Sequence, residues 1–300
     1  MTLNIKKYSF MPSLISAILI GIYHIGAESF IRFFGDHLLI MAVVINISGG
    51  IFLFLLIPNK KEIIKKMPGK DLLSLFVASF FAFGLAYLCL YKSIDLIGSI
   101  KVSFLIQIEA VFIIILAILF LKERFKLIEF FGLLVVLLGI LLLNFANSLL
   151  SFSIGVGEIY TLLAALSFAI GIIIISKLVK KYSLTYLTSI EMIFGGIILS
   201  LFLIADPIAI KPLFILLLLP IGFILAMGWL TYNLGVKYVG AAKNAIIFSS
   251  QSFFTLVFSY FICNLIPSLG ITIPSNIPFV LLGGAIIFGG IVILELSKTK

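Results

Sequence analysis

Residues 87–144 read YLCLYKSIDLIGSIKVSFLIQIEAVFIIILAILFLKERFKLIEFFGLLVVLLGILLLN, a stretch in which two short polar connections separate three apolar runs. The middle run carries the carboxylate of Glu109, and Gln107 lies two residues before it. A charged side chain at the centre of a bilayer costs about 3 kcal/mol or more, so it is retained where it serves a function. The stretch therefore predicts successive membrane-spanning helices, with a candidate site around Glu109.

The composition of the whole chain is that of a membrane protein. Hydrophobic residues make up 63% and charged residues 11%, and the mean hydropathy is +1.33, whereas a soluble domain is about half apolar and a quarter charged. The chain is therefore predicted to be an all-α integral membrane protein, without a nucleic-acid partner despite its net charge of +9. The cysteines Cys89 and Cys263 and the histidines His24 and His37 match no metal or redox spacing. No metal and no cofactor are expected.

Prolines, glycines and charge clusters divide the chain into ten apolar runs, each close to the ~20 residues that cross a bilayer. The first run is interpreted as a retained span and not as a signal peptide, because it is long and contains His24 and Glu28. The connections are short and no nucleotide-binding loop is evident, which argues against a soluble domain and against ATP-driven transport. The predicted spans are 12–33, 37–57, 71–91, 102–121, 127–146, 157–177, 184–205, 212–234, 243–264 and 277–296.

The basic residues predict the orientation of these spans. If ten helices alternate in direction, 17 of the 21 lysines and arginines fall on the side of the N-terminus. The positive-inside rule then places both termini in the cytoplasm of a multi-pass protein of the cell membrane. A miscounted helix would scramble this bias, so the charges support the count as well. The four basic residues on the other side are Arg32, Lys92, Lys101 and Lys211.

A weak internal repeat divides the ten spans into two sets of five. Gly240 follows Gly98 by 142 residues, and Gln251 follows Glu109 by the same interval. Because five is odd, the second set enters the membrane inverted relative to the first, and inverted repeats place a binding site near the midplane where they meet. We expect the fourth and ninth spans to lie together at this centre. The predicted repeats are 1–146 and 147–300, forming one membrane domain.

Several features of these repeats are typical of one family. They are the run Tyr87–Tyr91, the step Gly98-Ser99, the helix end Leu121–Arg124, and Gly132 with Gly139. With its five-plus-five arrangement, the chain resembles the drug/metabolite transporter superfamily, in particular its ten-helix EamA-type exporters. The resemblance implies export of a small metabolite such as an amino acid through a central cavity lined by both repeats. The chain departs from the family pattern where Lys122 replaces the usual glycine before the turn acid. It departs again in the second repeat, where Asn264–Pro267 contains no acid.

The polar residues inside the predicted spans are the candidates for substrate binding. Glu109 lies near mid-depth of the fourth span, where it could bind a substrate amine or carry a proton, and Gln251 is its counterpart in the ninth. The alternative for both is a structural hydrogen bond between helices. His24 and Glu28 are four residues apart and share one helix face. They are equally consistent with a proton relay and with a pair that holds two helices together.

Aromatic residues of the third and eighth spans could form walls of the same cavity. Tyr87 and Tyr91 share a face of the third span, and the eighth span contains Trp229, Tyr232 and Asn233. Such walls suit amino-acid-like or ring-bearing substrates, although aromatic residues near helix ends more often form interface belts. The predicted substrate-binding residues are Glu109, Gln251, Gln107, His24, Tyr87, Tyr91, Trp229, Tyr232 and Asn233, and the predicted proton-coupling residues are Glu109, His24 and Glu28.

These patterns favour a secondary transporter that moves a small metabolite by alternating access, with protons as a candidate coupling ion. The alternative is an intramembrane enzyme acting on a lipid or polyprenyl substrate, which would need reactive or metal-binding side chains clustered at one membrane face. The polar residues are instead spread over several spans near mid-depth, as expected along a pathway. A monomer and a homodimer are both compatible with the sequence.

The charge distribution gives a testable topology. In a variant without Cys89 and Cys263, a single cysteine at Asn59 or Lys180 should be protected from an impermeant thiol reagent added to intact cells. A cysteine at Asn276 should react. Labelling of the Asn59 variant from outside, without permeabilisation, would contradict the topology.

Overall fold

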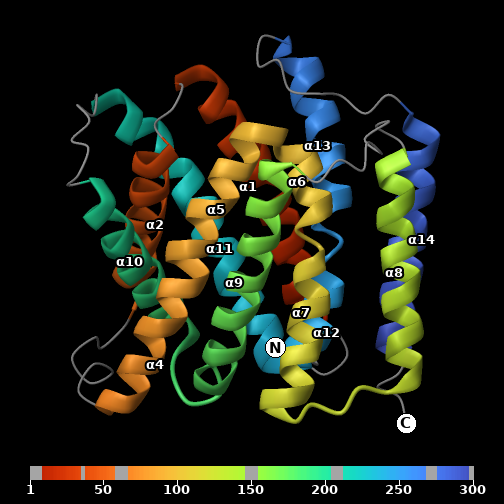
Figure 1. Ribbon diagram of the computed structural model, residues 1–300, viewed down its shortest axis with the longest axis horizontal. Helices are drawn as coiled ribbons and strands as arrows, with labels where there is room; N and C mark the ends of the chain where they lie inside the picture. The colour runs from red at the N-terminus through yellow and green to blue at the C-terminus, as the bar shows by residue number, and fades with distance from the viewer. Residues whose placement is uncertain are drawn as a thin grey trace, which may run out of the picture.

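The computed structural model describes residues 9–34, 38–57, 67–145, 155–203, 212–267 and 276–296, and every regular element in these ranges is a helix (Figure 1). The first repeat consists of α1 (Met11–Phe34), α2 (Leu38–Leu55), α4 (Gly69–Ser79), η1 (Phe80–Leu85), α5 (Ala86–Ile97), α6 (Ser99–Leu105), α7 (Ile108–Leu116), η2 (Ala117–Leu121) and α8 (Leu127–Phe145). The second consists of α9 (Val156–Leu178), α10 (Leu184–Leu203), α11 (Pro212–Val239), α12 (Ala241–Phe248), α13 (Gln251–Leu265) and α14 (Ile277–Leu296).

These elements confirm the predicted all-helical membrane fold. Over the described residues, nine helices are long and apolar enough to cross a bilayer, and Leu127–Leu142 of α8 forms a shorter tenth. α4, η1 and α5 together make the third span. The fourth span is α6, α7 and η2, and the ninth is α12 and α13. The start of α4 with Lys70, the end of α9 with Lys177 and the end of α11 with Lys237 lie at one end of the bundle, called here the lysine-rich end (Figure 1). Lys92 and Lys101 lie at the opposite end.

The predicted boundaries were wrong where two spans join. The third helix was expected to end at residue 91 and the eighth at residue 234, but they continue to Ile97 and Val239. On the extra turn of α5, Lys92 and Asp95 form an ion pair at 3.2 Å. These charged residues therefore stabilise the helix and do not end it. A single glycine then makes each connection, Gly98 with φ of +79° and Gly240 with φ of +88°. Glycine adopts this conformation without steric cost.

The fourth and ninth helices are both interrupted near mid-depth. The interruption lies at Ile106 and Gln107 in one, and at Ser249 and Ser250 in the other. The turns tighten there: the Glu109 N–H bonds the Ile106 carbonyl at 2.9 Å, three residues back instead of four. Short 3₁₀ stretches inside helices often mark functional hinges. The two interruptions occupy equivalent places in the two repeats.

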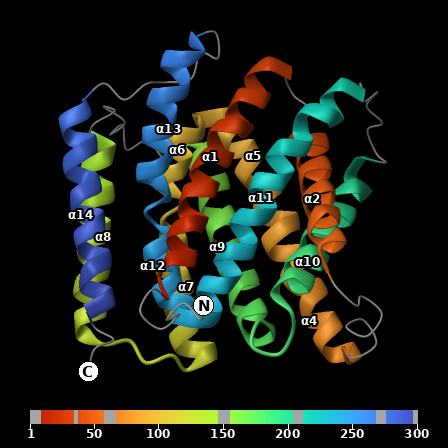
Figure 2. The ribbon, with the colours of Figure 1, turned by 180° about the vertical axis from the view of Figure 1, so that it is seen from behind.

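Equivalent helices of the two repeats pack against one another. α8 lies along α14 at one edge of the bundle and α2 along α10 at the opposite edge, as both views show (Figures 1 and 2). Between these pairs, α7 contacts α12 and α6 contacts α13, so the fourth and ninth spans are neighbours at the centre. This is the arrangement expected for two inverted repeats.

Glycines allow α8 and α14 to approach closely. A Cβ on Gly290 would lie 2.9 Å from the Gly132 carbonyl oxygen and 3.0 Å from the Val136 nitrogen. Backbone atoms cannot move aside as a flexible side chain can. Small residues at such contacts are typical of membrane helix pairs.

Neighbouring glycines of α14 provide a matched test of this contact. Gly290→Ala should destabilise the protein by about 1–3 kcal/mol, as overpacking does in close-packed interiors. Gly289→Ala should be neutral or slightly stabilising, because nothing lies within 4 Å of its added Cβ and alanine favours helix. Thermal unfolding in detergent measures both. Equal melting temperatures for the two variants would contradict the packing described.

Candidate functional site

A cavity lies at the centre of the bundle, between the two repeats. Its volume is ≈ 20 Å³, measured over the positions that the centre of a water molecule can occupy, which is room for about one water. The cavity is therefore too small to hold a substrate in this conformation. Its lining residues are Ile20, His24, Tyr87, Leu90, Ile106, Glu109, Phe168, Trp229, Phe248 and Gln251.

Three polar side chains at this cavity have atoms without a hydrogen-bond partner among the described residues. They are His24 Nδ1, Glu109 Oε1 and Gln251 Oε1, and the three side chains are only 3%, 5% and 2% exposed. Burying a polar group without a partner costs about 1–3 kcal/mol in proteins. Unpaired atoms converging from α1, α7 and α13 on one cavity therefore indicate a place for a ligand.

The helix interruptions position two of these side chains. Glu109 lies in the first turn of α7, directly after the interruption of the fourth helix. Gln251 is the first residue of α13, directly after the interruption of the ninth. The N-terminal end of a helix segment carries partial positive charge, which favours a carboxylate. Gln107 itself does not line the cavity; its side-chain amide donates to the Ser103 carbonyl at 2.7 Å and supports the break.

Aromatic rings enclose the cavity. Trp229 Nε1 donates to Tyr87 Oη at 2.6 Å, and both rings pack on Phe168, with centroids 5.6 Å and 5.2 Å from it. Tyr232 packs edge-on against Phe248 at 4.8 Å, behind the lining. The predicted Tyr87 and Trp229 thus belong to the wall, whereas Phe168 was missed because a lone phenylalanine among 30 carries no signal.

Other predicted residues lie away from the cavity lining. Tyr91 accepts a hydrogen bond from Tyr23 at 2.5 Å and belongs to the surrounding wall. Asn233 donates to Thr188 at 2.9 Å and to Glu191 at 3.4 Å. Asn233 is therefore part of a separate buried cluster towards the lysine-rich end.

Glu28 meets the start of α6, although it shares one helix with His24. Its carboxylate accepts hydrogen bonds from the Ser99 N–H at 3.1 Å and from the Ser99 hydroxyl. It therefore caps the first turn of α6, just after Gly98. Carboxylates at helix N-termini are stabilising because they accept from unpaired N–H groups and face the positive end of the helix dipole.

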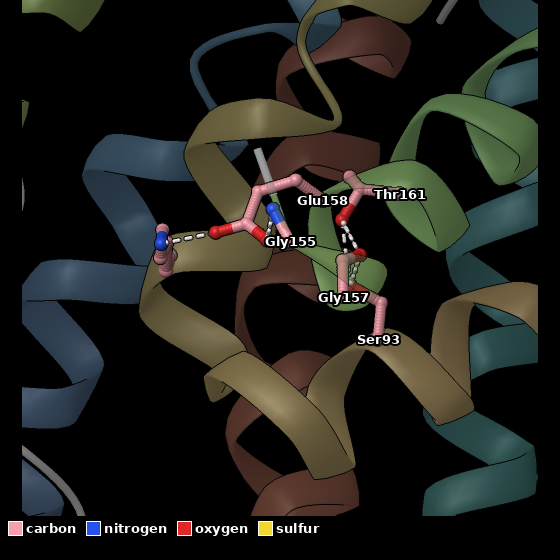
Figure 3. Close-up of polar contacts among 6 residues, drawn as sticks. Ser93, Gly155, Gly157, Glu158 and Thr161 are labelled. Atoms are coloured by element: carbon pink, nitrogen blue, oxygen red, sulfur yellow. Dashed lines mark hydrogen bonds and ion pairs between the residues drawn. The ribbon is translucent and has the colours of Figure 1, made fainter. Parts of the chain in front are cut away.

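Further contacts close the same end of the bundle. Lys101 of α6 pairs with Glu158 at the start of α9, and the other Glu158 oxygen accepts from the Gly155 N–H at 3.0 Å (Figure 3). Ser93 of α5 bonds the Gly157 carbonyl at 2.9 Å and the Thr161 hydroxyl at 2.6 Å (Figure 3). The first helix of the second repeat is thereby fixed to the first repeat.

The lysine-rich end has the corresponding arrangement in the second repeat. Glu123, in the turn between η2 and α8, accepts from the Ala241 and Ala242 N–H groups at 3.0 Å and 3.1 Å. It caps α12 just after Gly240, as Glu28 caps α6. The neighbouring Lys243 pairs with Glu129 at 2.5 Å. Sequence reasoning treated Glu123 only as a family motif; the paired Gly98 and Gly240 steps are the signal that could have predicted both caps.

The model of the EamA-like transporter family matches residues 8–145 and 155–296, one match to each repeat. The chain belongs to this family. It is therefore a multi-pass membrane transporter of small solutes, and the family gives no support to the alternative of an intramembrane enzyme. A solved structure titled "Crystal structure of protein" is similar in fold, with a TM-score of 0.67 at 16% identity over 94% of this chain and 97% of the other. No curated protein matches the chain.

The cap made by Glu123 can be tested against its neighbour. Glu123→Gln should destabilise the protein by about 1 kcal/mol, because the α12 N-terminus loses its charged acceptor. Arg124→Gln changes the net charge by one unit in the opposite direction at a neighbouring exposed position and should leave the melting temperature nearly unchanged. Thermal unfolding in detergent distinguishes them. A Glu123→Gln protein as stable as the wild type would argue against the cap.

Proposed function

We propose that this transporter is a secondary carrier that exports a small amine-bearing, amino-acid-like metabolite by alternating access at the central cavity. It acts in the cell membrane with both termini in the cytoplasm. The observation that carries the proposal is the convergence of Glu109 Oε1, Gln251 Oε1 and His24 Nδ1, all buried and unpartnered, on one cavity between the repeats.

The chemistry of the lining favours an ammonium group. The Glu109 and Gln251 oxygens accept hydrogen bonds, and an ammonium group supplies three donors together with a charge opposite to that of a carboxylate. Tyr87 and Trp229 add aromatic faces, which attract cations and accommodate an apolar side chain. His24 Nδ1 donates or accepts according to its tautomer, so it suits a second polar group on the same ligand.

The two helix caps suggest how access alternates. Glu28 and Glu123 hold the first turns of α6 and α12 at opposite ends of the bundle, and both helices lead to an interruption beside the cavity. Release of one cap, with bending at the interruption, opens the cavity to one side while the other cap keeps it closed. In this mechanism, a cavity as small as the present one belongs to the closed state between the two.

Protons are the proposed coupling ion. Glu109 binds a cationic substrate only when it is ionised, so a proton and a substrate compete for the same carboxylate. His24 at the cavity and Glu28 at the cap are the further candidates for protonation. A single carboxylate that alternately carries a proton and a substrate couples their movements in opposite directions.

Trp229 provides a direct assay because it is the one tryptophan of the chain and lines the cavity. Amino acids and short alkyl amines should change its fluorescence on binding, while their N-acetyl forms, which lack the charge, should not. Glu109→Gln should abolish the response and lower proteoliposome uptake at least roughly tenfold, because the ion pair with the amine is lost. It should also remove the pH dependence of uptake.

The folded state should survive this change, since burial of an amide costs less than burial of an unpaired carboxylate. Thermal melting of Glu109→Gln is the control for folding. Wild-type uptake with unaltered pH dependence in Glu109→Gln would end the proposal. So would binding of the N-acetyl forms as tight as that of the free amines.

A further inference from the structure

A second hollow lies away from the central cavity, between α4 and α9 at the lysine-rich end. Its volume is ≈ 520 Å³, and none of its lining residues is shared with the central cavity. Lys70 and Ser74 of α4 line it on one side, and Lys177 and Lys181 line it on the other. α4 and α9 are in direct contact; the start of α4 and the end of α9 lie near the bottom of Figure 1.

The charge of this groove is positive. Among the described residues that line it, Asp71 is the acidic one. The Asp71 carboxylate accepts a hydrogen bond from Tyr182 Oη at 2.7 Å and forms an ion pair with Lys181 at 3.3 Å. The hydrogen bond to Asp71 raises the pKa of Tyr182 to about 12, so the tyrosine stays neutral. Lys70 and Lys177 are exposed, so the lysines among the described lining residues outnumber the carboxylate of Asp71.

The groove continues into an apolar surface. Leu73 and Val77 of α4 and Ile174 of α9 line it beyond the lysines, and Leu73 is 63% exposed. From Lys70 to Val77 the helix rises about 10 Å, which leads from the membrane interface into the hydrocarbon region. A soluble anion would contact only the basic part of the groove, whereas a molecule with a charged head and an apolar tail matches the basic part and the apolar part.

We propose that the groove between α4 and α9 binds an anionic phospholipid, with its phosphate at Lys70 and Lys177 and an acyl chain along Leu73 and Val77. Basic pockets between membrane helices at the cytoplasmic face are suited to anionic headgroups. Lysine is a common phosphate ligand as a point charge. The bound lipid bridges the third span, which carries Tyr87, and the first helix of the second repeat, which carries Phe168. It thereby joins two walls of the central cavity from outside.

The proposal can be tested on the purified full-length protein in detergent. Three compounds are added separately: dioleoylphosphatidylglycerol, dioleoylphosphatidylcholine and inorganic phosphate. The anionic lipid should raise the melting temperature and appear as a retained adduct in native mass spectrometry. The zwitterionic lipid with the same chains should bind with an affinity at least tenfold lower, and inorganic phosphate should have no effect. A phosphate response equal to that of the anionic lipid would identify a free-anion site and overturn the lipid assignment.

Matched variants locate the effect. The double variant Lys70→Gln/Lys177→Gln should bind the anionic lipid roughly tenfold more weakly or worse, because each lysine or arginine near anionic lipid contributes to the free energy of binding. Lys70→Arg/Lys177→Arg should keep it. Arg124→Gln/Lys237→Gln removes two charges from a different basic hollow at the same end and should bind as the wild type does. Equal loss in this control, or full binding by Lys70→Gln/Lys177→Gln, would refute the assignment to this groove.

Discussion

Within a bilayer, each backbone N–H or C=O group must find its partner inside the protein, because no water is available to replace it. Continuous helices meet this demand, but the fourth and ninth helices begin at a sharp glycine turn and are interrupted near mid-depth. Their starts are completed by carboxylates from elsewhere, Glu28 for α6 and Glu123 for α12. The interruptions are supported locally by side chains such as Gln107. The rest of the bundle can be understood as the support for these two broken helices.

Each cap brings a residue from a sequence-distant segment to the start of a broken helix. Glu28 comes from the first helix of its own repeat, while Glu123 comes from the other repeat. The two repeats therefore share the glycine turn and the broken helix, but the carboxylate that caps the helix comes from a different position in each. This explains why Asn264–Pro267, the second-repeat counterpart of the acid turn, needs no carboxylate: the corresponding position at α6 is already occupied by Glu28.

The sequence was sufficient to predict the fold because each signal can be read along the chain. Bilayer thickness sets the length of a span, the positive-inside rule sets the charge bias of the connections, and the repeat appears as a constant interval between matching residues. It also singled out Glu109, Gln251 and His24, which are polar at a depth where polarity is costly; the three line one cavity, and their role in binding stays a prediction. It could not predict that Glu28 accepts hydrogen bonds from Ser99, because sharing a helix face with His24 does not determine which neighbouring helix each side chain meets. It missed Phe168 because apolar lining residues have no composition signal, and it assigned Asn233 to a cavity wall when Thr188 and Glu191 hold it elsewhere.

The cavity lining also constrains how the closed state can form. Among its lining residues in the described part of the chain, Glu109 is the carboxylate and none is lysine or arginine. A buried ionised carboxylate without a counter-charge is strongly destabilised. In the proposed mechanism, the cavity therefore closes readily when Glu109 holds a proton or a cationic substrate, and closes poorly when it holds neither. An empty, ionised carrier then tends to stay open to one side, which links the outward movement of substrate to the return of a proton. In this mechanism the caps open and close the cavity, and the coupling of substrate to protons follows from the cost of one buried charge.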